Sequence, residues 1–262
     1  MESLSSNSFF LIEKVPVSKT TPEHARKSVL ELVQQKKGGY ITIGNMRTTV
    51  IANHDPAYLD VVKNAQMNWP DGMPLVWCAR AWGLKDVQRT VGPDAFVSLL
   101  SDSKNGLKHF LIGDTEETLS ALINKYKTEF NTCFAGYISP PFVDWPDFDY
   151  EGIAEQVKKS GANIVWVSMR APKQDFFNKR LSGLLPGVLC IGVGAGFRFA
   201  LGKYKQPPAL WKKMGLTGFF WMREGILYNV FWYIKHLFYL LSFLIRITYK
   251  KNVLYRFQTR NY

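Results

Sequence analysis

The sequence contains few cysteines and histidines, and both are widely scattered. Its 262 residues include three cysteines, at positions 78, 133 and 190, and four histidines, at positions 24, 54, 109 and 236. No C-x-x-C pair occurs, and the histidines lack metal-binding spacing. The motifs G-x-S-x-G and G-x-x-x-x-G-K-[ST] are missing as well. These absences argue against a disulfide framework, a zinc site, a serine hydrolase and a P-loop nucleotidase, and the cysteines are expected to be core thiols.

A secretory leader is also missing from the start of the sequence. The segment MESLSSNSFFLIEKVPV has no basic stretch ahead of its short apolar run, which argues against a signal peptide. We therefore expect the chain to stay in the cytoplasm.

Acidic side chains are nearly absent from the C-terminal segment 201–262. It holds eleven lysines and arginines but one acid, Glu224, and so carries +10 of the net charge of +12. From Leu216 the segment is dense in aromatic and aliphatic residues, and a membrane-spanning helix would place Lys235 near the middle of the hydrocarbon, at high cost. The pattern favours a helix or helix pair in the membrane interface, where basic residues attract anionic lipid. A core helix and an interface with a second copy of the chain are the alternatives.

Through the first 200 residues, apolar runs typical of strands alternate with amphipathic helices. Strands are expected at residues 8–16, 40–45, 108–113, 134–139, 162–169 and 188–194, and helices at 21–35, 47–53, 56–66, 73–83, 93–101, 115–130, 150–159 and 175–183. Several strands are continuous apolar runs, which indicates a mostly parallel sheet with helices on both faces. We therefore predict an α/β core over residues 1–202 and a helical, membrane-associating appendage over residues 203–262.

The loops that follow the predicted strands are rich in glycine and basic residues. In an open parallel sheet, ligands bind beyond the C-terminal ends of the strands. The loops in question are IGNMR (43–47), IGDTEE (112–117), SPPF (139–142), RAPKQD (170–175) and GVGAGF (192–197). Backbone amides beside glycines can approach a phosphate. GVGAGF is no dinucleotide fingerprint, because Phe197 stands where the fingerprint has its third glycine. Close packing of strand on helix explains these glycines equally well.

A carboxylate stands in a turn ahead of the predicted helix 73–83. The stretch NWPDGMPLVW places Asp71 between Pro70 and Gly72, and Pro-Asp-Gly is ordinary turn chemistry. By local chemistry Asp71 is either a turn residue or a carboxylate at the mouth of a site.

Eight short motifs in one order resemble the WecG/TagA/CpsF glycosyltransferase family across residues 9–225. They are Asn45, Asp71-Gly72, Arg89 to Gly92, IGD at 112–114, GYISPPF at 136–142, APKQD at 171–175, GVGAGF at 192–197, and Gly202 followed by GL at 215–216. The resemblance implies a Rossmann-like fold and an inverting transfer, without metal or other cofactor, of a sugar from a nucleotide diphosphate, usually UDP. The implied acceptor is a polyprenyl-diphosphate-linked sugar at the cytoplasmic face of the bacterial inner membrane, where the enzyme would bind peripherally and serve surface polysaccharide synthesis.

The resemblance also assigns roles to individual residues. It implies that Asp71 is the general base, with Arg89 and Gln174 beside it in the catalytic pocket. The residues implied to bind the nucleotide-sugar are Asn45, Gly113, Asp114, Pro172, Lys173, Gly192, Gly194 and Arg198, and those implied for the acceptor or its diphosphate are Arg170 and Arg223. A carboxylate base suits inversion because it can take the proton of the acceptor hydroxyl during attack on the anomeric carbon. Without a metal, arginines and amides would stabilise the leaving diphosphate.

The sequence departs from the family pattern at several positions. It has Ile43 where the family usually has threonine, Arg170 where the family has glycine, and Arg198 where the family has aspartate. The tail reads GLTGFFWMREG, where the family has GLEW and an arginine-rich helix. One hypothesis reconciles these changes: Arg170 and Arg198 supply the charge for the diphosphate that the family draws from tail arginines, and the tail is more purely a membrane anchor.

Two other functions compete with transfer. A catalytically silent family member could bind a nucleotide-sugar or lipid-linked glycan as a scaffold; Asp71, Arg89 and Gln174 argue against this, and the changed positions argue for it. The positive charge alone would suit a nucleic-acid-binding protein. Its interleaving with a long aromatic run favours membrane and no nucleic acid, and flotation with anionic liposomes separates the two.

Overall fold

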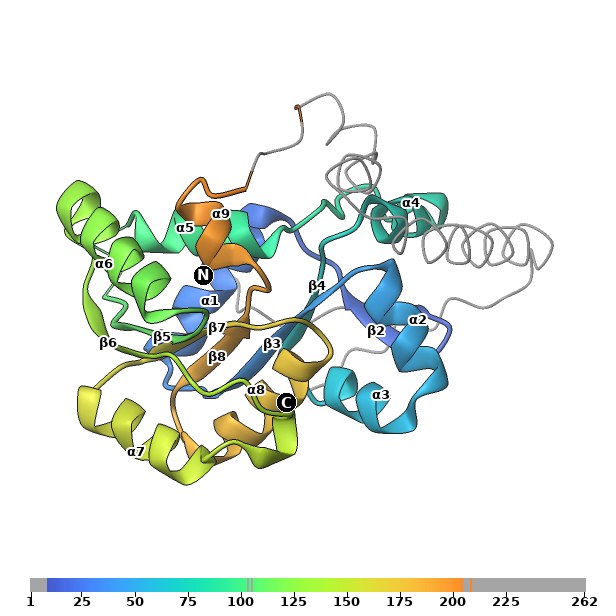
Figure 1. The fold of residues 1–262 in the computed structure, drawn as a ribbon. Coiled ribbons are helices and arrows are strands. Elements are labelled where there is room, and N and C mark those ends of the chain that lie inside the picture. Colours follow the sequence, from blue (N-terminus) through green and yellow to red (C-terminus); the bar gives the residue numbers. More distant parts are fainter. Residues whose placement is uncertain (1–8, 103, 105, 205–207, 209–262) are drawn as a thin grey trace.

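The centre of the molecule is a parallel six-stranded sheet. The computed structural model describes residues 9–102, 104, 106–204 and 208. The strand order is β4-β3-β8-β7-β5-β6, and every adjacent pair is parallel (Figure 1). The strands are Gly39–Gly44 (β3), Met67–Pro70 (β4), His109–Gly113 (β5), Phe134–Ile138 (β6), Ile164–Ser168 (β7) and Leu189–Gly192 (β8). The predicted Rossmann-like α/β fold is confirmed.

Helices pack on both faces of this sheet. The helices of the described residues are Pro22–Gln34 (α1), Met46–His54 (α2), Pro56–Lys63 (α3), Met73–Ala81 (α4), Gly92–Leu100 (α5), Glu116–Phe130 (α6), Tyr150–Ser160 (α7), Lys173–Leu184 (α8) and Gly196–Ala200 (α9), and α4 packs on the N-terminal hairpin instead of on the sheet. Successive strand residues point to opposite faces. Trp166 of β7 therefore packs in the cluster formed with α1, α5, α6 and α9, while Val165 packs with α3, α7 and α8. Each face has its own apolar core.

The N-terminal region is a hairpin rather than the single strand expected at 8–16. Strands β1 (Phe9–Ile12) and β2 (Val15–Ser18) pair antiparallel. Glu13 breaks the run because its φ of 55° lies in the left-handed region, where the chain turns back. The hairpin and α4 share a third apolar cluster, which includes Ile12, Val17 and Leu75.

Strand β4 was not predicted, although it carries the turn with Asp71. It pairs with β3 in parallel and forms the edge of the sheet, with Gly44 opposite Pro70. Only four residues long and containing Asn68 and Pro70, it has neither the length nor the apolar run that identifies a strand. Proline is tolerated here because β4 is at the edge of the sheet. The turn therefore lies beside the end of β3.

The remaining elements agree with the sequence predictions apart from a few boundaries and one cysteine. Helix α8 begins at Lys173, so Gln174 lies in its first turn and not in a loop. Cys78 and Cys190 are buried free thiols as expected, but Cys133 is exposed because it lies between α6 and β6. No helix among the described residues is long and apolar enough to cross a membrane. The predicted appendage at 203–262 lies almost entirely outside the described residues.

Candidate active site

The predicted site residues lie in the loops at the C-terminal ends of the strands. Because all six strands run in the same direction, these loops meet at one edge of the sheet. Asn45 follows β3, Asp71 follows β4, Asp114 follows β5, Arg170 follows β7 and Gly194 follows β8. The topology therefore gathers groups that are up to about 150 residues apart in the sequence, at the crevice where parallel sheets bind ligands.

Asp71 is held next to Asn45 and Arg89. Its backbone N–H donates to the carbonyl of Gly44 at 2.8 Å, which continues the ladder between β3 and β4 by one residue. Arg89 reaches the same residue twice: Nε donates to the Asp71 carbonyl at 3.0 Å and Nη2 to carboxylate Oδ1 at 3.2 Å. The loop that carries Arg89 is fixed in turn, because the N–H of Thr90 donates to the Pro70 carbonyl at 2.8 Å. Asp71 is thus both a turn residue and one half of an ion pair.

The surroundings of Asp71 raise the pKa of its carboxyl to about 6. Burial is the main cause, and Asp94 adds a smaller repulsion, while the charge and hydrogen bond of Arg89 offset part of the shift. Solvent still reaches 23% of the side chain, so a substrate hydroxyl has access to it. A carboxylate whose pKa lies close to the working pH is suited to accept a proton.

Asn45 caps the helix that starts beside Asp71. Its Oδ1 accepts from the N–H of Thr48 at 3.1 Å, and the Thr48 hydroxyl accepts from the N–H of Asn45 at 2.9 Å, which completes a capping box. A Cβ placed on Gly72 would lie 3.7 Å from both Cα and Cβ of Asn45, so the two loops are in contact. Asn45 is exposed at this edge, and its amide nitrogen has no hydrogen-bond partner among the residues that the structure describes.

Ile43, which stands where the family has threonine, faces away from this edge. It is 8% exposed and belongs to the core under α1 and α5. A Cβ on Gly92 would lie 2.3 Å from Cδ1 of Ile43, so the isoleucine occupies the space that the missing side chain of Gly92 leaves. The departure at residue 43 is therefore an apolar packing feature in this chain.

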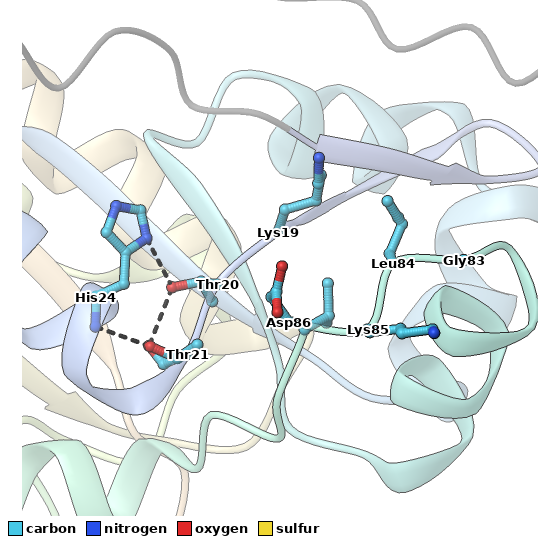
Figure 2. Close-up of a pocket in the computed structure, with 9 residues that line it drawn as sticks. Lys19, Thr20, Thr21, His24, Gly83, Leu84, Lys85 and Asp86 are labelled. Carbon is cyan, nitrogen blue, oxygen red and sulfur yellow. Dashed lines mark hydrogen bonds between the residues drawn. The ribbon is translucent and has the colours of Figure 1, made fainter.

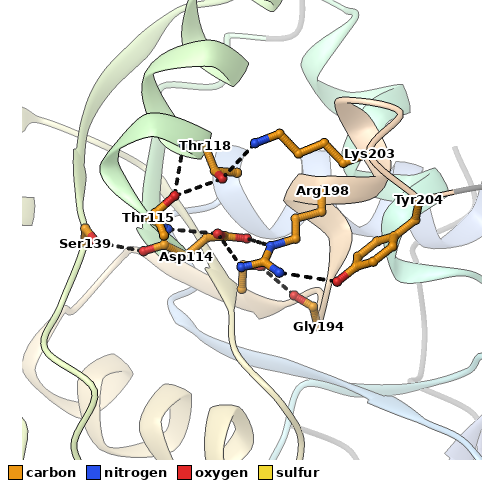
Figure 3. Close-up of polar contacts among 9 residues, drawn as sticks. Asp114, Thr115, Thr118, Ser139, Gly194, Arg198, Lys203 and Tyr204 are labelled. Atoms are coloured by element: carbon orange, nitrogen blue, oxygen red, sulfur yellow. Dashed lines mark hydrogen bonds and ion pairs between the residues drawn. The ribbon is translucent and has the colours of Figure 1, made fainter. Parts of the chain in front are cut away.

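A second carboxylate–arginine pair lies at the end of β5. Asp114 accepts from Arg198 twice, at Oδ2 from Nε (2.8 Å) and at Oδ1 from Nη2 (3.1 Å) (Figure 3). Arg198 also donates to the hydroxyl of Tyr204 at 3.4 Å, and the hydroxyl of Ser139 donates to the Asp114 carbonyl at 2.7 Å. Burial alone would raise the pKa of Asp114, but the hydrogen bonds from Arg198 and from the N–H of Thr115 outweigh it and lower that pKa. Asp114 therefore stays ionised, and both of its carboxylate oxygens accept hydrogen bonds.

Both peptide groups of Gly194 are held by side chains. Its N–H donates to Oε1 of Gln174 at 2.9 Å, and its carbonyl accepts from the hydroxyl of Ser168 at 2.6 Å. Gln174 is 3% exposed, and a Cβ on Gly192 would lie 2.7 Å from its Cδ, so the glutamine fits closely against the end of β8. Gly113 is equally confined, since a Cβ there would lie 2.5 Å from the Ser168 carbonyl. Gly113 and Gly192 therefore allow close packing, which for Gly192 is the alternative that the sequence left open, whereas a Cβ on Gly194 would meet nothing within 4 Å.

Three further predicted residues lie near the start of α8. Lys173 is directed toward the loop before η1 (Trp145–Asp147), where its ammonium group contacts the Val143 carbonyl and lies 5.0 Å from the ring centre of Phe142. Arg170 is exposed, and its side chain has no hydrogen-bond or ion-pair partner among the described residues. Pro172 precedes the helix as its N-cap residue. Arg223 lies outside the described residues.

A cavity of about 500 Å³ adjoins the loop that carries Arg89 (Figure 2). It lies between the connection from β2 to α1 and the segment after α4, and it is lined by Lys19, Thr20, Thr21, His24, Gly83, Leu84, Lys85, Asp86 and Val87. The N–H of Gln88, which follows the lining residue Val87, donates to the carbonyl of the lining residue Thr20 at 3.0 Å. No predicted site residue lines it, so we assign the chemistry to the strand ends.

Comparison with known proteins decides the family. The family model of the glycosyl transferase WecG/TagA/CpsF family matches residues 10–224. The chain belongs to this family. It is 27% identical over 190 residues to the N-acetylglucosaminyldiphosphoundecaprenol N-acetyl-beta-D-mannosaminyltransferase of Bacillus subtilis (strain 168), a match that covers 72% of each chain. The predicted resemblance and the assignment as a glycosyltransferase are confirmed.

Within this glycosyltransferase, two groups of predicted residues come together besides the Asp114–Arg198 pair. Asn45, Asp71 and Arg89 come together at the ends of β3 and β4, while Gln174 and Gly194 are joined at the end of β8. The sequence pattern did not identify Ser168, whose hydroxyl fixes the Gly194 carbonyl. It also did not identify Arg47, which donates to the Ala171 carbonyl at 2.9 Å and so ties α2 to the loop after β7. In the sequence, only the position of these two residues next to the end of a predicted strand indicated that they could belong to the site.

Proposed function

We propose that this glycosyltransferase transfers a sugar, with inversion, from a nucleotide-diphosphate sugar to a polyprenyl-diphosphate-linked sugar, and that Asp71 is the general base. The related Bacillus subtilis protein is named as an N-acetylmannosaminyltransferase acting on N-acetylglucosaminyl-diphosphoundecaprenol, which supports a lipid-linked acceptor and the use of this activity in surface polysaccharide synthesis. The observation that carries the proposal is the accessible Asp71 carboxylate with a pKa of about 6, held by Arg89 at the ligand-binding edge of the sheet.

The role of Asp71 follows from the stereochemistry of inversion. The acceptor hydroxyl attacks the anomeric carbon as the bond to the nucleotide diphosphate breaks on the opposite side. One carboxylate takes the hydroxyl proton in this step, and such help accelerates transfer by about 10²–10⁴-fold. Arg89 fixes the direction of that carboxylate, since it contacts both the main chain and the side chain of Asp71.

The leaving diphosphate needs positive charge. Arg170 is a cation that could bind this diphosphate. It is exposed just after the end of β7, and its side chain has no hydrogen-bond or ion-pair partner among the described residues. Arg198 is committed to Asp114, so a phosphate would have to share it with that carboxylate. The assignment of both arginines to the diphosphate stays a prediction, and the geometry favours Arg170.

The basic C-terminal segment fits a lipid-linked acceptor. Residues 201–262 carry +10 of the net charge, interleaved with aromatic residues, and each basic residue near an anionic surface contributes about 1 kcal/mol. We propose peripheral attachment to the cytoplasmic face of the inner membrane through this segment, with Arg223 near the acceptor. The full chain should float with anionic vesicles and stay bound when the salt concentration is raised, because its aromatic residues would enter the interface, whereas a nucleic-acid-binding protein held to the vesicles by charge alone would be released.

The experiment that tests the function is a screen of UDP-linked sugars against a lipid-diphosphate-sugar acceptor analogue. Product formation, with an inverted anomeric centre seen by NMR, supports the proposal. Binding of the donor without any turnover would instead support the silent scaffold, and the Asp71→Asn variant distinguishes a slow enzyme from an inactive one. If the Asp71→Asn variant transferred sugar as fast as the unaltered protein, Asp71 would not be the general base.

A further inference from the structure

We propose that Arg47 is a positioning residue of the active site, because its side chain ties the loop after β7, which carries Arg170, to the start of α2, which carries Asn45. Arg47 acts through the placement of Arg170 and not by touching the reacting atoms. The consequence for catalysis rests on the proposed function, whereas the tie itself does not.

The tie is a hydrogen bond between two loops that are far apart in the sequence. Arg47 is half-buried in the first turn of α2, and its Nη1 donates to the carbonyl of Ala171 at 2.9 Å, 124 residues further along the chain. Strand β8 lies between β3 and β7 in the sheet, so two strand spacings, about 9.6 Å, separate the strands that end in these loops (Figure 1). Because β3 and β7 do not pair directly, the long arginine side chain joins loops that the sheet connects only through β8.

Both ends of this tie are anchored. At one end, Arg47 follows Asn45 by two residues, and the capping box of Asn45 fixes the start of α2. At the other end, the carbonyl of Arg170 accepts from the N–H of Gln174 at 3.3 Å as the loop enters α8. Two successive carbonyls of the loop, those of Arg170 and Ala171, are therefore held, and Arg47 holds the second one.

The side chain of Arg170 contrasts with this fixed main chain. It is exposed and has no hydrogen-bond or ion-pair partner among the described residues. The region that its guanidinium can reach is therefore set by the position of its own main chain. Arg47 fixes that main chain at the next residue, so it determines where the proposed cation for the diphosphate starts from.

The tie joins the two parts of the site that an inverting transfer must keep apart at a set distance. Asp71 belongs to the Asn45 side, since a Cβ on the adjacent Gly72 would lie 3.7 Å from Cα of Asn45. The base and the leaving diphosphate lie on opposite sides of the anomeric carbon, so the separation of Asp71 and Arg170 has to match the substrates. Misplacing such groups by about 1 Å can lower the rate by about 10²-fold. Loss of Arg47 would leave both groups present and let their separation vary.

Lys125 provides a matched control on the opposite face of the sheet. Like Arg47 it is half-buried, and its Nζ donates to a distant main-chain carbonyl, that of Ala200, at 3.0 Å. This contact joins α6 to the end of α9, whereas α2 and α8 pack against the other face. Lys125→Met therefore removes the same kind of contact and leaves the loop after β7 unaltered.

The first test is amide hydrogen exchange at Gln174, measured by NMR on the full-length protein without substrate. Arg47→Met keeps most of the side-chain length but removes the donors, and it should speed this exchange by about tenfold, because a hydrogen bond from a charged group has an effect of that order. Arg47→Lys, which keeps a cationic donor, should give an intermediate rate and serves if Arg47→Met does not fold. Lys125→Met should leave exchange at Gln174 unchanged. Equal exchange in the unaltered protein and the two Arg47 variants would overturn the inference.

The second test is a double-mutant cycle with Arg170→Ala, which separates positioning from stability because coupled residues give effects that do not add. Arg47→Met alone should lower kcat/KM for the nucleotide-sugar by about tenfold to a hundredfold, and in the Arg170→Ala background it should have little further effect. Lys125→Met should have the same small effect in both backgrounds. An equal loss from Arg47→Met in both backgrounds would overturn the catalytic consequence, even alongside faster exchange. If the unaltered protein transfers no sugar, the proposed function fails, and exchange at Gln174 still decides whether Arg47 holds the loop.

Discussion

Two carboxylate–arginine pairs lie at the same edge of the sheet, and the arginine is used differently in each. Arg89 donates from Nη2 to the carboxylate of Asp71 and from Nε to the main-chain carbonyl of the same residue. Arg198 donates from both Nε and Nη2 to the carboxylate of Asp114 (Figure 3). Burial opposes ionisation in both carboxyls, yet the pKa of Asp71 is raised and that of Asp114 is lowered. The number of hydrogen bonds thus distinguishes a group ready to accept a proton from one that holds structure.

Replacing the first carboxylate should have the largest effect. Asp71→Asn keeps the size of the side chain and removes its basicity, so we expect kcat to fall by about 10²–10⁴-fold. Steady-state assays of transfer would measure this loss. The matched control is Asp114→Asn, the same substitution in the second pair. An equal loss of kcat in the two variants would contradict the division of roles.

Weakening the first pair should have an intermediate effect. Arg89 lowers the pKa of Asp71 against the effect of burial, so Arg89→Gln should move that pKa further upward. At pH 6 we expect transfer to fall by about tenfold to a hundredfold, since a hydrogen bond to a charged group contributes about 1.5–3 kcal/mol. Activity should partly recover as the pH is raised, because the carboxyl then ionises. A loss that is the same at every pH would show that Arg89 acts in some other way.

Breaking the second pair should change stability more than rate, and only slightly. The Arg198 side chain is 45% exposed, so solvent screens the pair and Arg198→Ala should lower the free energy of unfolding by about 1 kcal/mol. Folding lowers the pKa of the Asp114 carboxyl. The stabilisation is therefore fully present above the pKa that Asp114 has in the unfolded chain, and it is lost as the pH falls through the lower pKa that Asp114 has in the folded protein. Urea unfolding of Arg198→Ala, Asp114→Ala and the double variant at two pH values measures the coupling. Arg170→Ala is the control, because Arg170 has no ion-pair partner within the part of the chain that the structure describes.

Much of the core could be predicted from the sequence, because its strands and helices carry long periodic apolar patterns. Strand β4 could not, since four residues that include Asn68 and Pro70 show no such pattern and pair only because β3 offers an open edge. The residues of the candidate site were named through the family motifs, and their roles stay predictions. The contacts within the site were not predicted: the Asp114–Arg198 pair joins residues 84 positions apart, and the burial of Gln174 depends on how α8 packs against β8. Such contacts are properties of tertiary packing.

The pH dependence of kcat/KM tests most directly the claim that Asp71 is a base poised by its surroundings. Burial raises the pKa of this carboxyl to about 6, and a general base acts in its ionised form. With donor and acceptor groups that do not titrate in the range, kcat/KM should therefore rise with pH, with a midpoint near 6, and reach a plateau above it. The rise should be absent from the residual activity of Asp71→Asn. A profile in the unaltered enzyme that is flat between pH 5 and 8, or a rise that survives in Asp71→Asn, would contradict the account.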